Sequence, residues 1–279
     1  MKRKYMIIVL MAGALELTGC SQGTSNSAKN GTTGSENTII SESDIAILDT
    51  EDMFTERDRD TEYDESECTA ISLSDEETKC DSDGVKMDGQ TVTITEGGTY
   101  LLTGSLSNGS VVVDTDKTEK VQLILENVSI INEEGAGICV EQADKVFITL
   151  ADGSTNKIVS NSFTGNEDTN IDGAIFSRED LTLNGSGTLK ITSAAHGIVS
   201  KDDLVLTGGV YQIQSEKQGL SGKESVRIAD GTFTITSGTD AIHSEDTDED
   251  TKGFVYITGG VLTLAAGGDG ISSSYVVQA

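Results

Sequence analysis

Residues 196–215 read HGIVSKDDLVLTGGVYQIQS, and residues 218–237 read QGLSGKESVRIADGTFTITS. The two stretches have the same length and share the order of their apolar, acidic and glycine positions. Residues 172–193 and 240–266 continue the pattern on either side. Repetition at a fixed period indicates a solenoid, in which each repeat buries its apolar residues against the next one.

The period and the alternation within each repeat identify the kind of solenoid. Apolar residues alternate with polar ones, as in Leu204/Leu206 and Tyr211/Ile213, and a period of two is typical of strands. A unit of about 22 residues with short strands suits one coil of a parallel β-helix. We predict an all-β, right-handed parallel β-helix over residues 85–279, with Tyr211 and Phe233 stacked in its core. The apolar residue that opens each repeat recurs after 23, 22, 22 and 29 residues, in Ile175, Ile198, Leu220, Ile242 and Ile271.

Composition agrees with this fold and excludes one class of function. The chain of 279 residues has 31 Gly and no Pro, and interior strands of a sheet exclude Pro because it cannot donate a ladder hydrogen bond. The net charge of −28 excludes a nucleic-acid-binding protein, which needs clustered Lys and Arg to neutralise phosphates. The absence of Trp disfavours tight binding of sugars on aromatic platforms.

The first twenty residues read as a secretory signal peptide. A basic start, Met1 to Lys4, precedes an apolar run too short to span a bilayer. The run ends in Leu17-Thr18-Gly19-Cys20, which resembles the bacterial lipobox, and this resemblance implies cleavage before Cys20 and lipidation of its thiol. We therefore expect an extracytoplasmic protein held at the cell membrane by lipid on Cys20. The alternative is an ordinary signal peptide in which Cys20 occurs by chance.

Residues 21–84 have the composition of a flexible acidic tether. Between Glu36 and Asp83 there are 18 acidic and 3 basic residues, and such a segment buries too little apolar area to offset its conformational entropy. The alternative is an acidic tail that binds cations or a partner. An extracytoplasmic location permits a disulfide between Cys68 and Cys80, but their spacing neither favours nor excludes it.

Several stretches of the body resemble a family of bacterial cell-surface carbohydrate-binding proteins that form right-handed parallel β-helices, similar in fold to pectate lyases. The resemblance implies binding of cellulose-like or acidic polysaccharides, calcium in the helix and no catalysis. His196 and Gln218 stand where that family usually has Asp or Asn, which puts calcium at those coils in doubt. The chain also stops at Ala279 inside an expected coil, so we expect the natural protein to be longer. The stretches that carry the resemblance are 98–107, 144–150, 174–177, 183–189, 197–203 and the repeat starts at Asp172, Asp240 and Asp269.

The fourth repeat contains the strongest candidate for a metal site. Its insertion has five carboxylates in the six residues 245–250, and Ca²⁺ takes six to eight oxygen ligands. A solvated acidic loop is the alternative. The predicted Ca²⁺ ligands are Asp240, Glu245, Asp246, Asp248, Asp250 and Asp269.

Sugar contacts are predicted on the outward strand positions. Tyr256 lies between the inward residues Val255 and Ile257, so it faces outward and is the best candidate for stacking on a sugar ring. Thr234 and Thr263 are outward hydroxyls that can bond an extended glycan. The two histidines are expected at a coil corner (His196) and pointing outward (His243), and the sequence supports no catalytic nucleophile beside either of them.

These features favour a monomeric, non-catalytic lipoprotein that binds polysaccharide, with calcium assisting. Two alternatives remain at this stage. One is a structural or adhesive surface protein without a glycan ligand. The other is a calcium-dependent polysaccharide lyase, which would need an Arg or Lys base near the calcium; the only arginines after residue 84, Arg178 and Arg227, lie outside the acidic repeat.

Overall fold

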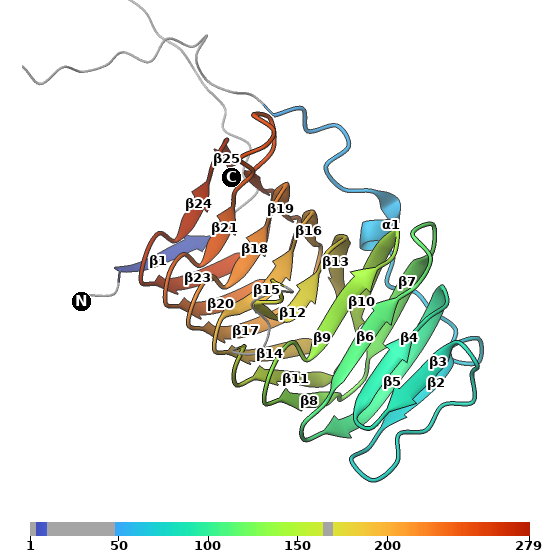
Figure 1. Ribbon diagram of the computed structural model, residues 1–279. Helices are drawn as coiled ribbons and strands as arrows, with labels where there is room; N and C mark the ends of the chain where they lie inside the picture. Colours follow the sequence, from blue (N-terminus) through green and yellow to red (C-terminus); the bar gives the residue numbers. More distant parts are fainter. Residues whose placement is uncertain (1–3, 10–47, 164–169) are drawn as a thin grey trace, which may run out of the picture.

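The computed structural model describes residues 4–9, 48–163 and 170–279, and there the chain winds as a right-handed parallel β-helix (Figure 1). Three sheets run along the helix, and each coil passes from sheet C through sheet B to sheet A. The predicted fold class is therefore confirmed.

The strands of each sheet follow one another at intervals of one coil. Sheet A contains β8 (Ser129–Asn132), β11 (Thr155–Ser160), β14 (Thr188–Ser193), β17 (Val210–Ser215), β20 (Thr232–Ser237) and β23 (Val261–Ala266). Sheet B contains β2 (Thr69–Leu73), β5 (Gly98–Leu106), β7 (Lys120–Leu125), β10 (Lys145–Leu150), β13 (Asp180–Gly185), β16 (Asp203–Leu206), β19 (Ser225–Ile228), β22 (Phe254–Ile257) and β25 (Val277–Gln278). Sheet C contains β3 (Val85–Asp88), β4 (Thr91–Ile94), β6 (Ser110–Asp114), β9 (Ile138–Gln142), β12 (Gly173–Ser177), β15 (His196–Ser200), β18 (Leu220–Gly222), β21 (Ile242–Ser244) and β24 (Ile271–Ser273).

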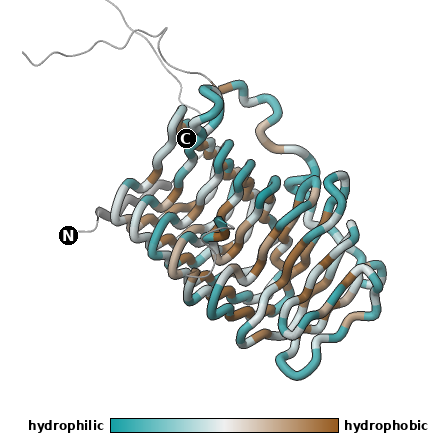
Figure 2. The backbone as a smooth tube through the Cα atoms, in the orientation of Figure 1, coloured by the Kyte–Doolittle hydropathy of each residue, from teal (hydrophilic) through white to brown (hydrophobic). Residues whose placement is uncertain are grey.

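The interior is a set of stacked apolar ladders that match the sequence repeat. The predicted opening residues pair in register from Ile175 to Ile271, and Tyr211 stacks on Phe233 with ring centroids 4.8 Å apart. Hydrophobic residues recur at equivalent places of successive coils (Figure 2). The burial of one coil thus depends on its neighbours, as expected for a solenoid.

The corner between sheets B and A requires glycine. Gly185, Gly209 and Gly260 each have φ of +95° at this corner, a conformation that costs glycine little. At Gly185 a Cβ would lie 2.2 Å from the Leu150 carbonyl oxygen of the previous coil. The glycine therefore allows both the sharp turn and the close stacking of coils.

The structure differs from the predicted tether over residues 48–84. β2 pairs in parallel with β5, which places Ile71 in the core with no exposed surface. A short helix, α1 (Glu56–Arg59), lies against the outside of sheet B, with α1 contacting β13 (Figure 1). The acidic composition did not predict these contacts, because only a few apolar and polar residues of the segment bind it to the β-helix. We call residues 53–60 the strap.

The remaining N-terminal predictions fall largely outside the described residues. These include Cys20 and residues 21–47 of the tether; within the predicted signal peptide, only β1 (Lys4–Val9) is described, and it pairs antiparallel with β23. In the described part of the chain, no helix is long and apolar enough to cross a membrane. Cys68 and Cys80, whose pairing the sequence left open, are both free thiols.

Candidate functional site

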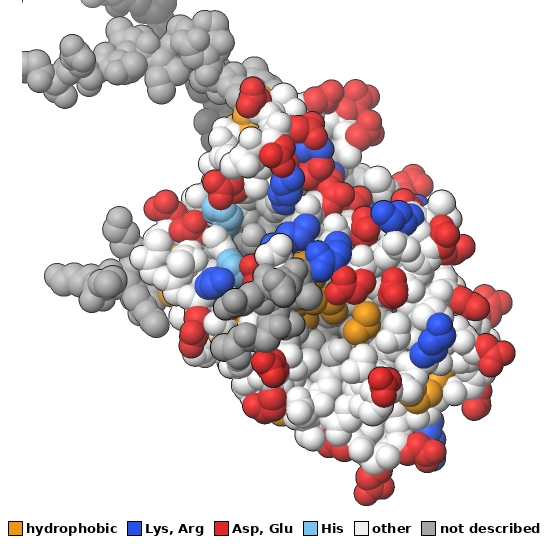
Figure 3. Space-filling view, viewed as in Figure 1, with side chains coloured by type: hydrophobic (Ala, Val, Ile, Leu, Met, Phe, Trp, Pro, Cys, Tyr) orange, Lys and Arg blue, Asp and Glu red, His pale blue; other side chains and the backbone are white. Residues whose placement is uncertain are grey.

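The outward side of sheet C holds a hollow that brings the two histidines together. His196 opens β15 and His243 is the middle residue of β21, two coils further along. The side chains of both histidines lie beside lysines on this face (Figure 3). We call this cavity of about 390 Å³ the histidine hollow; it is lined by Asp172, His196, Val199, Ser200, Lys201, Gln218, Ser221, Gly222, Lys223, His243 and Glu245.

His196 is held in one orientation by hydrogen bonds. Its Nδ1 accepts from the backbone N–H of Gln218 at 3.3 Å, and its Nε2 lies 3.4 Å from a carboxylate oxygen of Asp172. Burial lowers the pKa of His196 to about 4, and nearby Lys217 and Lys201 oppose its protonation while Asp172 favours it. The imidazole is therefore neutral at pH 7, with Nε2 as the donor.

His243 stands between two carboxylates. Its Nδ1 lies 3.2 Å from Asp240 Oδ2, and its Nε2 lies 3.5 Å from Glu245 Oε2. Two of the predicted calcium ligands thus face an imidazole. The His243 ring and Glu245 line one end of the hollow with groups that can donate or accept hydrogen bonds.

Two lysines place positive charge at the hollow. Lys201 Nζ lies 3.5 Å from Asp172, and Lys223 Nζ lies 2.8 Å from Asp248 and 3.8 Å from Asp246. Their side chains are 38% and 42% exposed, so both ammonium groups remain reachable from solvent. An anionic group entering the hollow would meet both.

A second cavity adjoins the hollow across a corner of the helix. It occupies about 540 Å³ where sheet A ends, and only two residues separate Ser193 in it from His196 in the hollow. Its serines are buried, but Thr192, Gln214 and Thr236 reach the surface and pair in register from coil to coil, so hydroxyl and amide groups recur about every 4.8 Å along the helix. We call it the hydroxyl groove; it is lined by Ser160, Asn161, Thr192, Ser193, Ala194, Gln214, Ser215, Glu216, Thr236, Ser237 and Gly238.

The predicted sugar-binding threonines lie on sheet A, and the groove is at the end of the same sheet. Thr234 and Thr263 are exposed, pair in register across β20 and β23, and face outward. Thr236, two residues after Thr234 on the same face of β20, lines the groove. Both threonines therefore lie on the outward face of sheet A, whereas the groove lies nearer the ends of the strands; their role in sugar binding stays a prediction.

Tyr256 faces outward from sheet B, but its ring is not free. The Phe54 ring of the strap lies against it, with centroids 5.9 Å apart. The sequence predicted the direction of the side chain correctly. It could not predict that Phe54 covers the ring, because Phe54 lies 202 positions earlier in the chain.

The structure does not bring the six predicted calcium ligands together. Asp246 is bound by backbone N–H groups of Asp248 and Glu249, and Asp240 accepts the backbone N–H of Asp269. Lys252 also enters the acidic insertion, where it pairs with Glu249 at 2.9 Å and with Glu224. Within the described residues, no group of three or more His, Cys, Asp or Glu could hold a metal.

The hollow was missed because its members are distant in the sequence and look ordinary one by one. A usable signal was present: Lys201 and Lys223 are 22 residues apart, one full coil, so the repeat alone stacks them. The two histidines are 47 residues apart, which fits no whole number of coils. They line the same hollow because His196 stands at the start of β15 and His243 in the middle of β21.

Comparisons with known proteins identify the fold and the family of the chain. A family model described as "Carbohydrate-binding domain-containing protein" matches residues 88–279. A protein of that description from Acetivibrio thermocellus is 35% identical over 137 residues, which are 48% of this chain and 48% of that one; the chain thus matches about half the length of this curated relative. A solved structure described as the polysaccharide lyase-like protein from C. thermocellum, a gadolinium derivative, superposes with a TM-score of 0.69 at 30% identity, over 76% of this chain and 96% of that one.

Proposed function

Because the chain belongs to the carbohydrate-binding domain family, we propose that it is a non-catalytic polysaccharide-binding lipoprotein, anchored outside the cytoplasm through Cys20. The observation that carries the proposal is the hydroxyl groove with the histidine hollow beside it. One surface offers regularly spaced neutral hydroxyls and amides, and the other offers exposed ammonium groups.

The two cavities suggest how a glycan would bind. An extended sugar chain has hydroxyls along its whole length, which can exchange hydrogen bonds with Thr192, Gln214 and Thr236 in the groove. A carboxylate on such a chain would find Lys201 and Lys223 around the corner, where a charge-assisted bond is stronger than a neutral one. The geometry therefore suits an acidic polysaccharide better than cellulose.

Pull-down on insoluble cellulose and on insoluble pectin tests the proposal. We expect retention on pectin, and a loss of at least tenfold in affinity for the double variant K201Q/K223Q. A matched control is K86Q, which removes an exposed lysine on β3, far from both cavities. Equal retention of the K201Q/K223Q and K86Q variants, or no retention of the parent protein on either material, would refute this assignment.

Calcium assistance, predicted from the sequence, is tested in the same assay by adding a chelator. The acidic insertion does not present a ligand set, and the lysines supply the positive charge that an acidic glycan needs. We therefore expect retention on pectin to survive chelation. Loss of retention with chelator, and its recovery with added Ca²⁺, would restore calcium to the proposal.

A lyase is the second candidate function, because the solved neighbour is described as lyase-like and a neutral His196 lies near Lys201. A lyase abstracts a proton beside the uronate carboxyl group and leaves an unsaturated sugar, which absorbs in the ultraviolet. We expect no such absorbance from polygalacturonate. A signal that disappears in H196A would make the protein an enzyme.

Anchoring through Cys20 is tested separately in the native host. The full chain should partition into detergent and carry acyl groups detectable by mass spectrometry, because acyl chains bind membranes through their buried methylene groups. The C20S variant should be found in the aqueous phase. Detergent partition of C20S would show that another segment holds the protein at the membrane.

A further inference from the structure

The strap crosses the outward face of sheet B rather than following one strand. Its Met53 carbonyl accepts from Arg227 on β19 at 3.0 Å, and its Phe54 lies against Tyr256 on β22. At the other end, Arg57 covers the Phe147 ring on β10 and donates to Gln122 on β7. The strap therefore runs along the helix axis, as an extended ligand lying across successive coils would.

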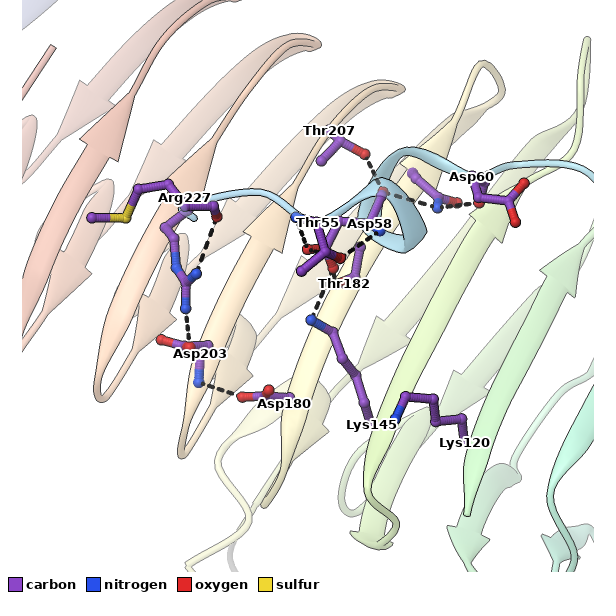
Figure 4. A network of polar contacts seen from close by, with 12 residues as sticks. Thr55, Asp58, Asp60, Lys120, Lys145, Asp180, Thr182, Asp203, Thr207 and Arg227 are labelled. Atoms are coloured by element: carbon purple, nitrogen blue, oxygen red, sulfur yellow. Dashed lines mark hydrogen bonds and ion pairs between the residues drawn. The ribbon is translucent and has the colours of Figure 1, made fainter. Parts of the chain in front are cut away.

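Asp58 is the centre of this contact. Its Oδ1 lies 2.8 Å from Lys145 Nζ and accepts the Thr182 hydroxyl at 2.7 Å (Figure 4). Its other oxygen is held by the backbone and hydroxyl of Thr55. The carboxyl is only 2% exposed. Oδ2 thus bonds within the strap, and Oδ1 bonds to sheet B.

Further donors from sheet B meet carbonyl oxygens of the strap. The Thr207 hydroxyl donates to the Asp58 carbonyl at 2.6 Å, and the Asn184 amide donates to the carbonyls of Asp58 and Asp60. Thr207 and Asn184 bring the number of such donors to five, together with Lys145, Thr182 and Arg227. These five side chains come from four adjacent coils, point outward and donate to the strap. Figure 4 shows labelled members of this row together.

Two basic residues of this face differ in where their ion-pair partners lie. Arg227 already pairs with Asp203 inside the sheet face, and Asp203 also donates its backbone N–H to Asp180 at 3.3 Å. Lys145 has its ion pair with Asp58, from the strap. Removal of the strap would leave Lys145 and its neighbouring hydroxyls facing solvent on the same sheet face as Tyr256, the predicted sugar-stacking residue, which lies four coils further along.

We propose that the outward face of sheet B is a second binding surface, for a polysaccharide that carries carboxylates, and that the strap occupies it as a displaceable substitute for that ligand. A uronate carboxylate would replace Asp58 on Lys145 and Thr182, its hydroxyls would replace the strap carbonyls, and a sugar ring would replace Phe54 on Tyr256. The contact is mostly polar, and a ligand with a carboxylate and hydroxyls would remake the hydrogen bonds that the strap gives up, so the donors of sheet B would stay paired. The proposal rests on the proposed function for its ligand class, but on a different face.

The test compares binding of a galacturonate hexamer and of cellohexaose to the full chain by titration calorimetry. We expect D58A to bind the galacturonate hexamer at least tenfold more tightly than the parent protein, and D58A/K145Q to lose this gain. Cellohexaose should show no such gain. Unchanged or weaker binding of the hexamer by a folded D58A protein would overturn the proposal.

Two further measurements keep the result interpretable. In the unmodified chain, saturating hexamer should increase hydrogen exchange of residues 53–60, and unchanged or slower exchange would contradict displacement of the strap.

The K201Q/K223Q variant tests the other surface: if it abolishes hexamer binding while D58A gives no gain, the proposed function holds and this inference fails. If D58A gains affinity that K201Q/K223Q leaves intact, the inference holds and the histidine hollow is not the site.

Discussion

Sheets B and C are built from the same repeats, yet their outward faces differ. The outward ladder of sheet B passes through Phe147, Thr182, Val205 and Arg227, and Thr182 and Val205 are at most 1% exposed. The outward ladder of sheet C passes from Phe176 and Val199 to Ser221 and His243 and ends in the open hollow. The difference teaches that the repeat determines the interior, whereas the outward faces depend on the non-repeating strap over sheet B and on substitutions at one repeat position in sheet C.

The largest effect is expected from a substitution in the interior. Leu204 points into the helix with no exposed surface, so we expect Leu204→Ala to lower the free energy of unfolding by about 2–5 kcal/mol. Denaturant titration followed by circular dichroism measures this. A loss below about 1 kcal/mol would show that the coil does not depend on its apolar ladder.

The strap on sheet B should loosen in acid. Although burial raises the pKa of Asp58, the bonds from Lys145 and Thr182 outweigh it and lower the pKa from 3.8 to about 2. A lowered folded-state pKa stabilises the protein above the unfolded value, and that stability is lost as pH falls from about 4 to about 2. The difference corresponds to about 2 kcal/mol.

Unfolding titrations at pH 5 and pH 2.5 measure this loss, with Asp58→Asn as the control. The parent protein should lose more stability between these pH values than D58N, because D58N has no carboxyl to protonate. Equal losses in the two proteins would contradict the role of Asp58.

A smaller effect of opposite sign is expected at the corner between sheets C and B. Burial and the neighbouring carboxylates Asp180 and Glu224 raise the pKa of Asp202 to about 6. A raised folded-state pKa means that stability falls as pH rises from about 4 to about 6. Asp202→Asn should therefore raise stability at pH 7 by about 1 kcal/mol, a value reduced for solvent screening.

Measurement of D202N and the parent protein at pH 4 and pH 7 checks the sign. The gain should be present at pH 7 and nearly absent at pH 4, where the parent carboxyl is mostly protonated in the folded state. A gain of equal size at both pH values would have to arise from something other than charge.

The smallest effect is expected on the open outward face of sheet A. Thr234 is exposed on the outward face of β20, so Thr234→Ala should change stability by less than about 0.5 kcal/mol. The same variant tests whether the predicted threonine row contributes to pectin retention beside the groove. A large loss of stability would show that sheet A does not have the free outward face described above.

The interior could be predicted from the sequence because its physics is local and repeated. The ladder from Ile175 to Ile271 follows from a period of about 22 residues and an alternation of two, and the structure pairs these residues in register. Stacking of Tyr211 on Phe233 follows from the same alignment. The long spacing of 29 residues between Ile242 and Ile271 follows from the insertion in the fourth repeat.

Apart from the stacking of Lys201 on Lys223, the contacts on the outward faces could not be predicted, because they join residues without a common period. Asp58 meets Thr182 across 124 positions, and no pattern marks that one acidic residue among many. The acidic insertion was expected to gather carboxylates, but Lys223 and Lys252 lie among them and pair with them.

That insertion lies at a corner, and its position has a consequence for how the fold can change. The corners from sheet C to sheet B are two residues long after β12, β15 and β18, but residues 245–253 fill the corner after β21. Val226 still pairs with Val255 beyond it, so a length change there leaves the register of both sheets intact. The corner is thus a natural site for grafting a foreign loop, with Ser244 and Phe254 as fixed ends.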